Sequence, residues 1–342
     1  MSPPCLCLNW MQWAGSCWYY LRFADPRNTQ TCLSPAAASD WLPVDIYVGG
    51  QEHAVLHLLY ARFWHKVLHR IGVVDHAEPF LRVVHQGIIL GPDGEKMSKS
   101  KGNVINPDTI IATVGADVLR LYEMFMGPLE ATKPWQDEQL SGVLRFRDRV
   151  YRLVREACRE HGVEEGNRGR GAGGHVAAMD DSLLRETHRT IKKVSLDIEA
   201  MSFNTAISAL MIYVNSLHAV REKGDVPPQA LETLVLLLSP FAPHVSEECW
   251  ELLGHSSSLA ERHWPVYDEE LCGIPKDALM TLPVQVNGRL RGTIDIRADA
   301  AEEDAVMLAM DSEPIARFLG DSTIVKRIYI QGKVLNFVIK KK

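Results

Sequence analysis

Apolar residues are spaced differently in three successive regions of the chain. In the first region, the nearly continuous apolar runs 44–50 and 83–90 are typical of strands buried in a parallel sheet. A helical pattern from about residue 52 to residue 70 separates the two runs. Strands that alternate with helices indicate an α/β domain built on a doubly wound sheet.

The second region has helical spacing throughout. Residues 137–160 place Val143, Phe146 and Val150 three or four positions apart, which predicts a long amphipathic helix. Three more helical patterns cover residues 182–201, 203–222 and 227–253. Together these patterns predict an all-α antiparallel bundle, with the glycine-rich stretch 164–174 as a linker between two of its helices.

The third region returns to strand spacing. Residues 281–286 and 289–296 flank an Asn287-Gly288 pair, which predicts a hairpin with a type I′ turn. Helices are expected over 299–310 and 315–319, and a second hairpin over 324–339. The chain is therefore expected to contain an α/β domain in residues 1–126, a bundle in 127–270 and a small α+β domain in 275–342.

Composition limits the possible partners. Of the 342 residues, 46% are hydrophobic and 23% charged, with a formal net charge of −6. A nucleic acid would therefore be held by local basic patches and not by the overall field. The seven cysteines form no CxxC pair, which argues against a zinc ribbon and a disulfide framework. No apolar run is long enough to cross a membrane, and the N-terminus carries no leader pattern that would indicate a compartment.

A lysine-rich loop lies between the second predicted strand and a helix that begins at Asn106-Pro107. The loop carries Lys96, Lys99 and Lys101 together with serine hydroxyls and flanking glycines. Such a loop handles phosphate groups in many nucleotide-binding proteins, but the same residues also suit an ordinary solvated basic loop.

The first predicted strand ends at Gly49-Gly50, where ligands bind in doubly wound sheets. His53 and His57 follow, four residues apart. A zinc site of the metalloprotease type needs a glutamate directly after the first histidine, whereas here Glu52 precedes it. We therefore expect no metal site, and we expect the two histidines to be buried or to face a substrate.

Two further patterns each allow two interpretations. The aromatic stretch from residue 10 to residue 22 fits a core helix or the wall of a pocket. An arginine stripe on the 137–160 helix fits a solvated surface or a nucleic-acid contact.

The lysine-rich loop has a recognisable signature. Its residues Lys96-Met97-Ser98-Lys99-Ser100 resemble, letter for letter, the KMSKS signature of class I aminoacyl-tRNA synthetases. Residues 47–62, the small residue before Trp18-Tyr19-Tyr20, and the phrases 201–206 and 238–244 are similar to the leucyl-tRNA synthetases of that class. The resemblance implies part of a Rossmann-type catalytic domain, an anticodon-binding bundle and a C-terminal α+β domain that contacts tRNA.

The resemblance also implies roles for individual residues. Lys96 and Lys99 would be catalytic residues that contact ATP. The ATP would be used together with Mg²⁺. The implied ATP-binding residues are Lys96, Ser98, Lys99, Gly50 and Glu52. The implied leucine-binding residues are Trp13, Ser16, Tyr19, Tyr47, His53 and His57. The implied tRNA-binding residues are Arg145, Arg149, Arg152 and Lys340, and the partners are leucine, ATP and tRNA(Leu).

The resemblance leaves a part of the family's pattern unmatched. No His-x-Gly-His motif occurs in the chain, and an editing domain is also missing. The sequence is thus expected to be the C-terminal portion of a leucine–tRNA ligase, which would need the missing N-terminal half as a partner. Two alternatives stay open, a non-catalytic tRNA-binding protein and an unrelated nucleotide-binding enzyme with a chance signature. The compartment would be the cytoplasm in a bacterium and a mitochondrion or chloroplast in a eukaryote.

Overall fold

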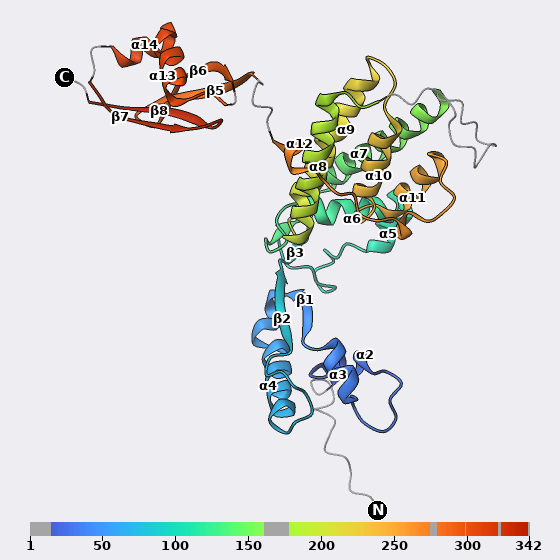
Figure 1. Ribbon diagram of the computed structural model, residues 1–342. Helices are drawn as coiled ribbons and strands as arrows, with labels where there is room; N and C mark the ends of the chain where they lie inside the picture. The colour runs from blue at the N-terminus through green and yellow to red at the C-terminus, as the bar shows by residue number, and fades with distance from the viewer. Residues whose placement is uncertain (1–14, 161–177, 274–278, 298, 321–322, 341–342) are drawn as a thin grey trace, which may run out of the picture. The chain divides into compact units, whose positions relative to one another are not determined.

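A computed structural model describes residues 15–160, 178–273, 279–297, 299–320 and 323–340 (Figure 1). Trp13 and the glycine-rich stretch 164–174 lie outside these residues. The chain divides into two compact units, one of residues 1–179 and 190–265 and the other of residues 180–189 and 266–342. The two units are described separately below.

The first unit begins with the predicted α/β region. Its elements are α2 (Tyr19–Ala24), α3 (Pro35–Trp41), β1 (Val44–Gly50), η1 (Gln51–Val55), α4 (His57–Arg70), β2 (Phe80–Gln86) and β3 (Ile89–Leu90). Strands β1 and β2 are parallel, and Gly49 pairs with His85 and Gly50 with Gln86. Both strands therefore end at the same edge of the sheet, as predicted for a ligand-binding α/β unit.

The single buried strand predicted over 83–90 is wrong in two respects. The run is split into β2 and β3, which belong to different sheets, because Gly87 packs its backbone against residues 130 and 131. The run is also less buried than expected, since Val83 is 38% exposed, and Ile46 and Val48 of the other predicted strand are 46% and 49% exposed. A local pattern of apolar residues predicts neither the break at Gly87 nor the exposure of the strand side chains.

The lysine-rich loop leads from β3 into two short helices, α5 (Pro107–Val114) and α6 (Ala116–Phe125). The Asn106 side chain accepts a hydrogen bond from the amide of Asp108, which confirms the predicted N-cap. Gly115 ends α5 with a φ of 92°, a conformation that favours glycine.

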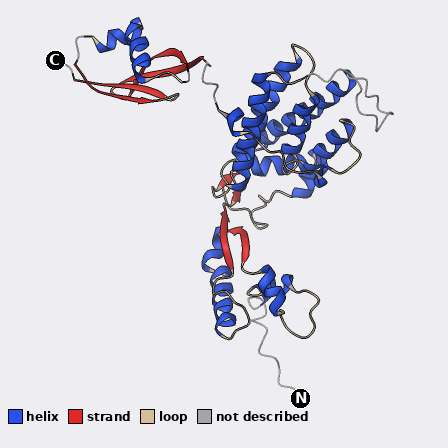
Figure 2. Ribbon diagram, viewed as in Figure 1, coloured by secondary structure: helices blue, strands red, loops and turns tan. Residues whose placement is uncertain are grey.

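The rest of the first unit is helical, apart from the two-residue strand β4 (Lys133–Pro134), which pairs with β3. The helices are α7 (Asp137–Glu160), α8 (Asp181–Glu199), α9 (Phe203–Arg221), α10 (Pro228–Leu238) and α11 (Pro243–Leu252), followed by the short turn η2 (Leu259–Glu261). Helices α6, α7, α9, α10 and α11 pack together in a bundle (Figure 2), which α6 joins although it was predicted to belong to the α/β domain. Its centre consists of fully buried aliphatic and aromatic side chains such as Leu153, Leu210, Tyr213 and Leu234.

Asp117 of α6 joins that helix to α11. The carboxylate is 5% exposed, and its Oδ2 accepts a hydrogen bond of 2.7 Å from the amide of Val245. Its Oδ1 lies 2.8 Å from Nδ1 of His244. An acidic group here satisfies amides that the first turn of α11 leaves without partners.

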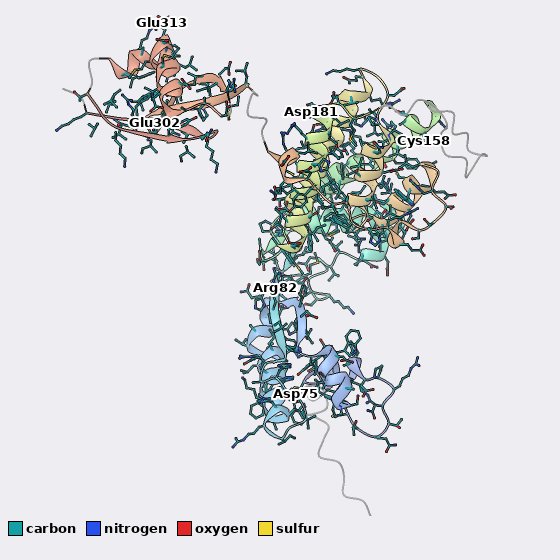
Figure 3. The ribbon with its side chains drawn as sticks, viewed as in Figure 1. Asp75, Arg82, Cys158, Asp181, Glu302 and Glu313 are labelled. Atoms are coloured by element: carbon teal, nitrogen blue, oxygen red, sulfur yellow. The ribbon has the colours of Figure 1, made fainter. Side chains whose placement is uncertain are left out.

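The second unit contains the start of α8, the short helix α12 (Glu269–Cys272) and the predicted α+β domain. That domain comprises β5 (Leu279–Val286), β6 (Arg289–Arg297), α13 (Glu302–Asp311), α14 (Glu313–Leu319), β7 (Thr323–Ile330) and β8 (Val334–Lys340). Its sheet has the order β6-β5-β8-β7, with β5 and β8 parallel. Glu302 and Glu313 lie in the first turns of the two helices (Figure 3), which pack on the sheet around Leu335 and Phe337.

The predicted type I′ turn is present. Asn287 and Gly288 have φ values of 51° and 75°, as this turn requires at both central positions. None of the helices in the described residues is long and apolar enough to cross a membrane.

We predict that Gly87→Ala destabilises the first unit. A Cβ atom at this position would overlap the Ala131 carbonyl group and lie 2.8 Å from the carbonyl oxygen of Glu130. Backbone atoms cannot move aside cheaply, so the free energy of unfolding should fall by about 1–3 kcal/mol in urea denaturation. The control is Gly142→Ala on α7, where nothing lies within 4 Å. That variant should be neutral or stabilising, and equal losses for both variants would contradict the packing argument.

Candidate functional site

A cavity of about 600 Å³ lies at the carboxyl ends of β1 and β2. Its walls come from the segment before α2, from both strands, from η1 and from the start of α4. The residues that line it are Ser16, Tyr19, Tyr47, Val48, Gly49, Gly50, His53, Leu56, His57, Leu58, Val83, His85 and Gln86. The structure thus brings together the five described residues that were predicted to bind leucine.

Two tyrosines and a histidine form a chain of hydrogen bonds in this cavity. The Tyr47 hydroxyl lies 2.5 Å from the Tyr19 hydroxyl and 2.6 Å from Nε2 of His57. Tyr47 also stacks on Phe80 with ring centroids 4.1 Å apart. These contacts fix the position of three polar groups in the cavity wall.

Burial shifts the pKa values of two members of this hydrogen-bonded group, Tyr47 and His57. It raises the pKa of Tyr47, and the hydrogen bond to Tyr19 raises it further. Burial also lowers the pKa of His57 below its usual value of 6.5, with a smaller contribution from nearby His53. Tyr47 and His57 are therefore neutral at physiological pH, which suits contact with an uncharged part of a ligand.

The two aromatic interpretations of residues 10–22 both hold for the described residues. Tyr20 and Leu21 are buried in the core of this region, while Ser16 and Tyr19 line the cavity. Tyr20 donates to or accepts from Nδ1 of buried His65 at 2.8 Å, a contact that the sequence did not predict.

Two polar cavity residues were not predicted from the sequence. His85 and Gln86 lie at the end of β2, in register with Gly49 and Gly50 of β1. The Nδ1 atoms of His85 and His57 are both buried without a hydrogen-bond partner among the described residues. The parallel pairing of two strand ends was the available signal, because it places the last residues of both strands at one edge.

Gly50 lines the cavity, and Glu52 does not. The Glu52 carboxylate instead folds over Gly50, where a Cβ atom would collide with it. Glycine at this position therefore allows a carboxylate to approach the backbone closely.

The lysine-rich loop forms a compact turn. Leu90 and Lys96 make an antiparallel bridge, and the amide of Gly91 donates to the carbonyl of Glu95 at 2.8 Å. Lys101 forms an exposed ion pair with Glu95 at 3.2 Å. Lys96 and Lys99 are exposed, and neither has an ion-pair partner in the described part of the chain. These two lysines are the loop cations that remain available to an anion.

The predicted tRNA-binding residues lie on two separate elements. Arg145, Arg149 and Arg152 are exposed on α7, and Arg149 donates a hydrogen bond of 2.8 Å to Asn215. Lys340 ends β8 in the second unit, opposite Thr323. No group of three or more His, Cys, Asp or Glu side chains that could hold a metal occurs within the residues the structure describes.

Two family models match the chain. Residues 36–134 match "tRNA synthetases class I (I, L, M and V)", and residues 180–306 match "Anticodon-binding domain of tRNA ligase". The first match contains β1, β2 and the lysine-rich loop. The second begins at α8 and runs into the α+β domain.

Curated relatives match almost the whole chain. The "Leucine--tRNA ligase" of Sorangium cellulosum (strain So ce56) is 53% identical over 328 residues, which are 96% of this chain and 36% of that protein. The "Leucine--tRNA ligase" of Chlorobaculum tepidum is 48% identical over 96% of this chain and 39% of its own length. The chain therefore spans less than two fifths of the length of these relatives.

Solved structures agree with these matches. The LeuRS of Agrobacterium radiobacter K84, in a ternary complex with tRNA and LeuAMS, superposes with a TM-score of 0.81 at 33% identity, over 96% of this chain and 42% of that one. The Mycobacterium tuberculosis methionyl-tRNA synthetase shares the fold at 20% identity, with a TM-score of 0.57 over 72% of this chain and 51% of that chain.

The fold, the KMSKS loop and both family models define a class I aminoacyl-tRNA synthetase, and the chain belongs to that class. Within the class it groups with the leucine–tRNA ligases and corresponds to their C-terminal portion. The resemblance found in the sequence is confirmed.

We predict that His57 titrates below pH 6.5, because burial disfavours its charged form. Between the lowered folded pKa and 6.5, the unfolded chain binds more protons than the folded one. The free energy of unfolding should therefore fall as the pH drops through this window and be unaffected by His57 above it. Histidine NMR titration, with the signal assigned by its loss in His57→Gln, measures the midpoint. A midpoint at or above 6.5 would contradict the burial of this ring.

Proposed function

We propose that this chain forms the C-terminal part of a leucine–tRNA ligase, which activates leucine with ATP and transfers it to tRNA(Leu). The observation that carries the proposal is the cavity at the strand ends, which gathers Ser16, Tyr19, Tyr47, His53 and His57. These five residues come from three segments of the chain outside the lysine-rich loop, so their convergence on one cavity is independent of the KMSKS signature.

The leucine side chain would occupy the apolar part of this cavity. Leu56, Leu58 and Val83 line it together with the faces of Tyr19 and Tyr47. His57 would face the side chain in its neutral form, because its pKa is lowered by burial. Such a pocket distinguishes leucine from an amino acid one methylene smaller by only about 1–3 kcal/mol, which fits a family that also edits its products.

ATP would bind across the ends of the strands, with Gly50 and Glu52 near the adenosine. Adenylation places growing negative charge on the departing pyrophosphate, and Mg²⁺ would enter with the triphosphate as part of the substrate. Lys96 and Lys99 are exposed and without carboxylate partners among the described residues, so they are free to meet this charge. Ser98 would add a neutral donor.

An additional part of the catalytic domain would cover the sheet. Parallel sheets are normally buried on both faces, but Ile46, Val48 and Leu81 are 46%, 49% and 69% exposed. Phe63 on α4 and Ile71 directly after that helix are each 66% exposed. The relatives are more than twice as long as this chain, and their additional N-terminal segments are the proposed cover. We refer to this chain joined to such a segment as the completed enzyme.

The tRNA would contact exposed cations on α7 and at the end of β8. Arg145 and Arg152 are seven residues apart on one helix, two turns along the same face, so they could follow a phosphate backbone. The relatives described above are bacterial, which favours the cytoplasm over an organelle as the compartment.

We predict that Lys99→Ala in the completed enzyme lowers the rate of leucine-dependent ATP–pyrophosphate exchange by about 10²-fold. The leucine KM should stay nearly constant, because the lysine acts on charge that develops at the pyrophosphate. Lys101→Ala is the matched control, since it removes the same charge from the same loop but from a lysine already paired with Glu95. It should lose much less activity. Equal losses, or a raised leucine KM at unchanged kcat, would move Lys99 out of this role.

We also predict that the chain alone binds tRNA with an affinity that falls steeply as salt is raised, because bound Lys and Arg release counterions. Replacing Arg145 and Arg152 by Gln should lower the slope of log K against log salt by roughly two. The control replaces Arg62 and Lys66, which pair with Glu78 on the α/β region, and should leave the slope unchanged. Filter binding over a salt series measures this. Salt-insensitive binding, or equal effects of both pairs, would remove the proposed role of α7.

A further inference from the structure

The lysine-rich loop has two arms that are joined by one side chain. The first arm, residues 91–96, turns back at Gly94, which has a φ of 75°. The second arm, residues 97–103, carries Ser98 and Lys99 and ends at Asn103. The Asn103 amide reaches back from the end of the second arm to both arms.

The contacts of Asn103 use both ends of its amide group. Its Nδ2 lies 3.0 Å from Oδ2 and 3.2 Å from Oδ1 of Asp93 in the first arm. Its Oδ1 accepts a hydrogen bond of 2.9 Å from the amide of Ser98 in the second arm. A backbone amide must donate and a carboxylate must accept, so the two partners determine which way the Asn103 amide points.

Asp93 is itself held in place. Its Oδ1 accepts a hydrogen bond of 3.1 Å from the amide of Glu95. That bond, followed by the contact with Asn103, keeps the pKa of the carboxyl group below its usual value, so Asp93 is a carboxylate at neutral pH. A hydrogen bond to an ionised acceptor is stronger than one between neutral groups.

A glycine makes room for this pair. A Cβ atom at buried Gly91 would lie 2.7 Å from Oδ1 of Asp93, 3.0 Å from Nδ2 of Asn103 and 3.2 Å from the Asn103 carbonyl oxygen. The side chains of Asp93 and Asn103 therefore pack directly over the backbone of Gly91. The other link between the arms, Lys101 with Glu95, is an exposed ion pair of the kind that contributes little.

We propose that Asn103 and Asp93 act as positioning residues for the reaction, because their hydrogen bonds hold together the two arms that carry Lys96 and Lys99. The inference rests on the proposed function of the loop. Lys96 lies in the first arm and Lys99 in the second, so a link between the arms sets the spacing of the two cations. A loop that is ordered before the pyrophosphate departs does not have to be ordered in the transition state.

The effect of a substitution at position 93 or 103 should depend on whether the new side chain donates or accepts hydrogen bonds, and not on its size. Asn103→Asp faces the Asp93 carboxylate with a second carboxylate, so it should disrupt the link as Asn103→Ala does. Exchanging the two side chains, as D93N/N103D, restores one donor opposite one acceptor. An oxygen at position 103 still accepts from the amide of Ser98. The exchanged pair should therefore recover most of what Asn103→Asp loses.

Hydrogen exchange of the loop tests the link directly, and it can be measured on this chain and its variants without any added N-terminal segment. The peptide covering residues 91–104 should exchange about tenfold faster in Asn103→Ala and Asn103→Asp, and close to the wild-type rate in D93N/N103D. Glu95→Gln, which breaks only the Lys101 ion pair, is the control and should leave the rate nearly unchanged. Unchanged exchange in Asn103→Ala would overturn the link. The free energy of unfolding, measured by urea, should change little, since all these side chains lie in an exposed loop.

Leucine-dependent pyrophosphate exchange by the completed enzyme tests the consequence. The kcat should fall about tenfold in Asn103→Ala, with the leucine KM within about twofold of wild type, and should recover in D93N/N103D. A loop that loosens in hydrogen exchange while kcat stays at the wild-type value would overturn the positioning role. A wild-type completed enzyme without any leucine-dependent exchange would instead overturn the proposed function, whatever the variants show.

Discussion

Two parallel strands cannot bury their own apolar faces. Among the residues that the structure describes, β1 and β2 pair with each other and with no further strand, and their side chains Ile46, Val48 and Leu81 are substantially exposed. A parallel pair needs layers on both faces and further strands at its edges. The proposed site lies at the carboxyl ends of these same strands, so the cavity depends on a pair of strands with exposed apolar side chains.

The lysine-rich loop, which would contact the triphosphate, is connected to the bundle by short helices. The lysine-rich loop runs directly into α5 and α6, and α6 is joined to α11 through the buried carboxylate of Asp117. Arg147 of α7 donates to the carbonyl of Val114 at 2.8 Å, at the end of α5. The loop is thus free at its tip but anchored at its base, which suits a segment that closes over a ligand and reopens.

The sequence predicted those features that depend on neighbours along the chain. The Asn106 cap, the Asn287-Gly288 turn and the helix over 137–160 are all in the structure, because each is determined within a few residues. The break at Gly87 was missed because its cause is a contact with residues 130 and 131, more than forty positions away. Exposure of the strands was missed because an apolar run records the need for cover and not whether the cover is present.

The site shows the same division. The KMSKS resemblance located the loop, and the resemblance to leucyl-tRNA synthetases located Ser16, Tyr19, Tyr47, His53 and His57, which the structure brings to one cavity. His85 and Gln86 carry no motif, and they reach the cavity only through the parallel register of β2 with β1. The Asn103–Asp93 contact also has no local signature, since a turn at Gly94 brings together residues ten positions apart.

The proposed leucine and phosphate site would work only when the sheet is completed. The direct measurement is leucine-dependent ATP–pyrophosphate exchange by this chain, by a separately produced N-terminal segment of a relative such as the Sorangium cellulosum ligase, and by the two mixed. We expect no exchange by either part and exchange by the mixture. Robust exchange by this chain alone, or an inactive mixture in which the two parts form a stable complex, would contradict it.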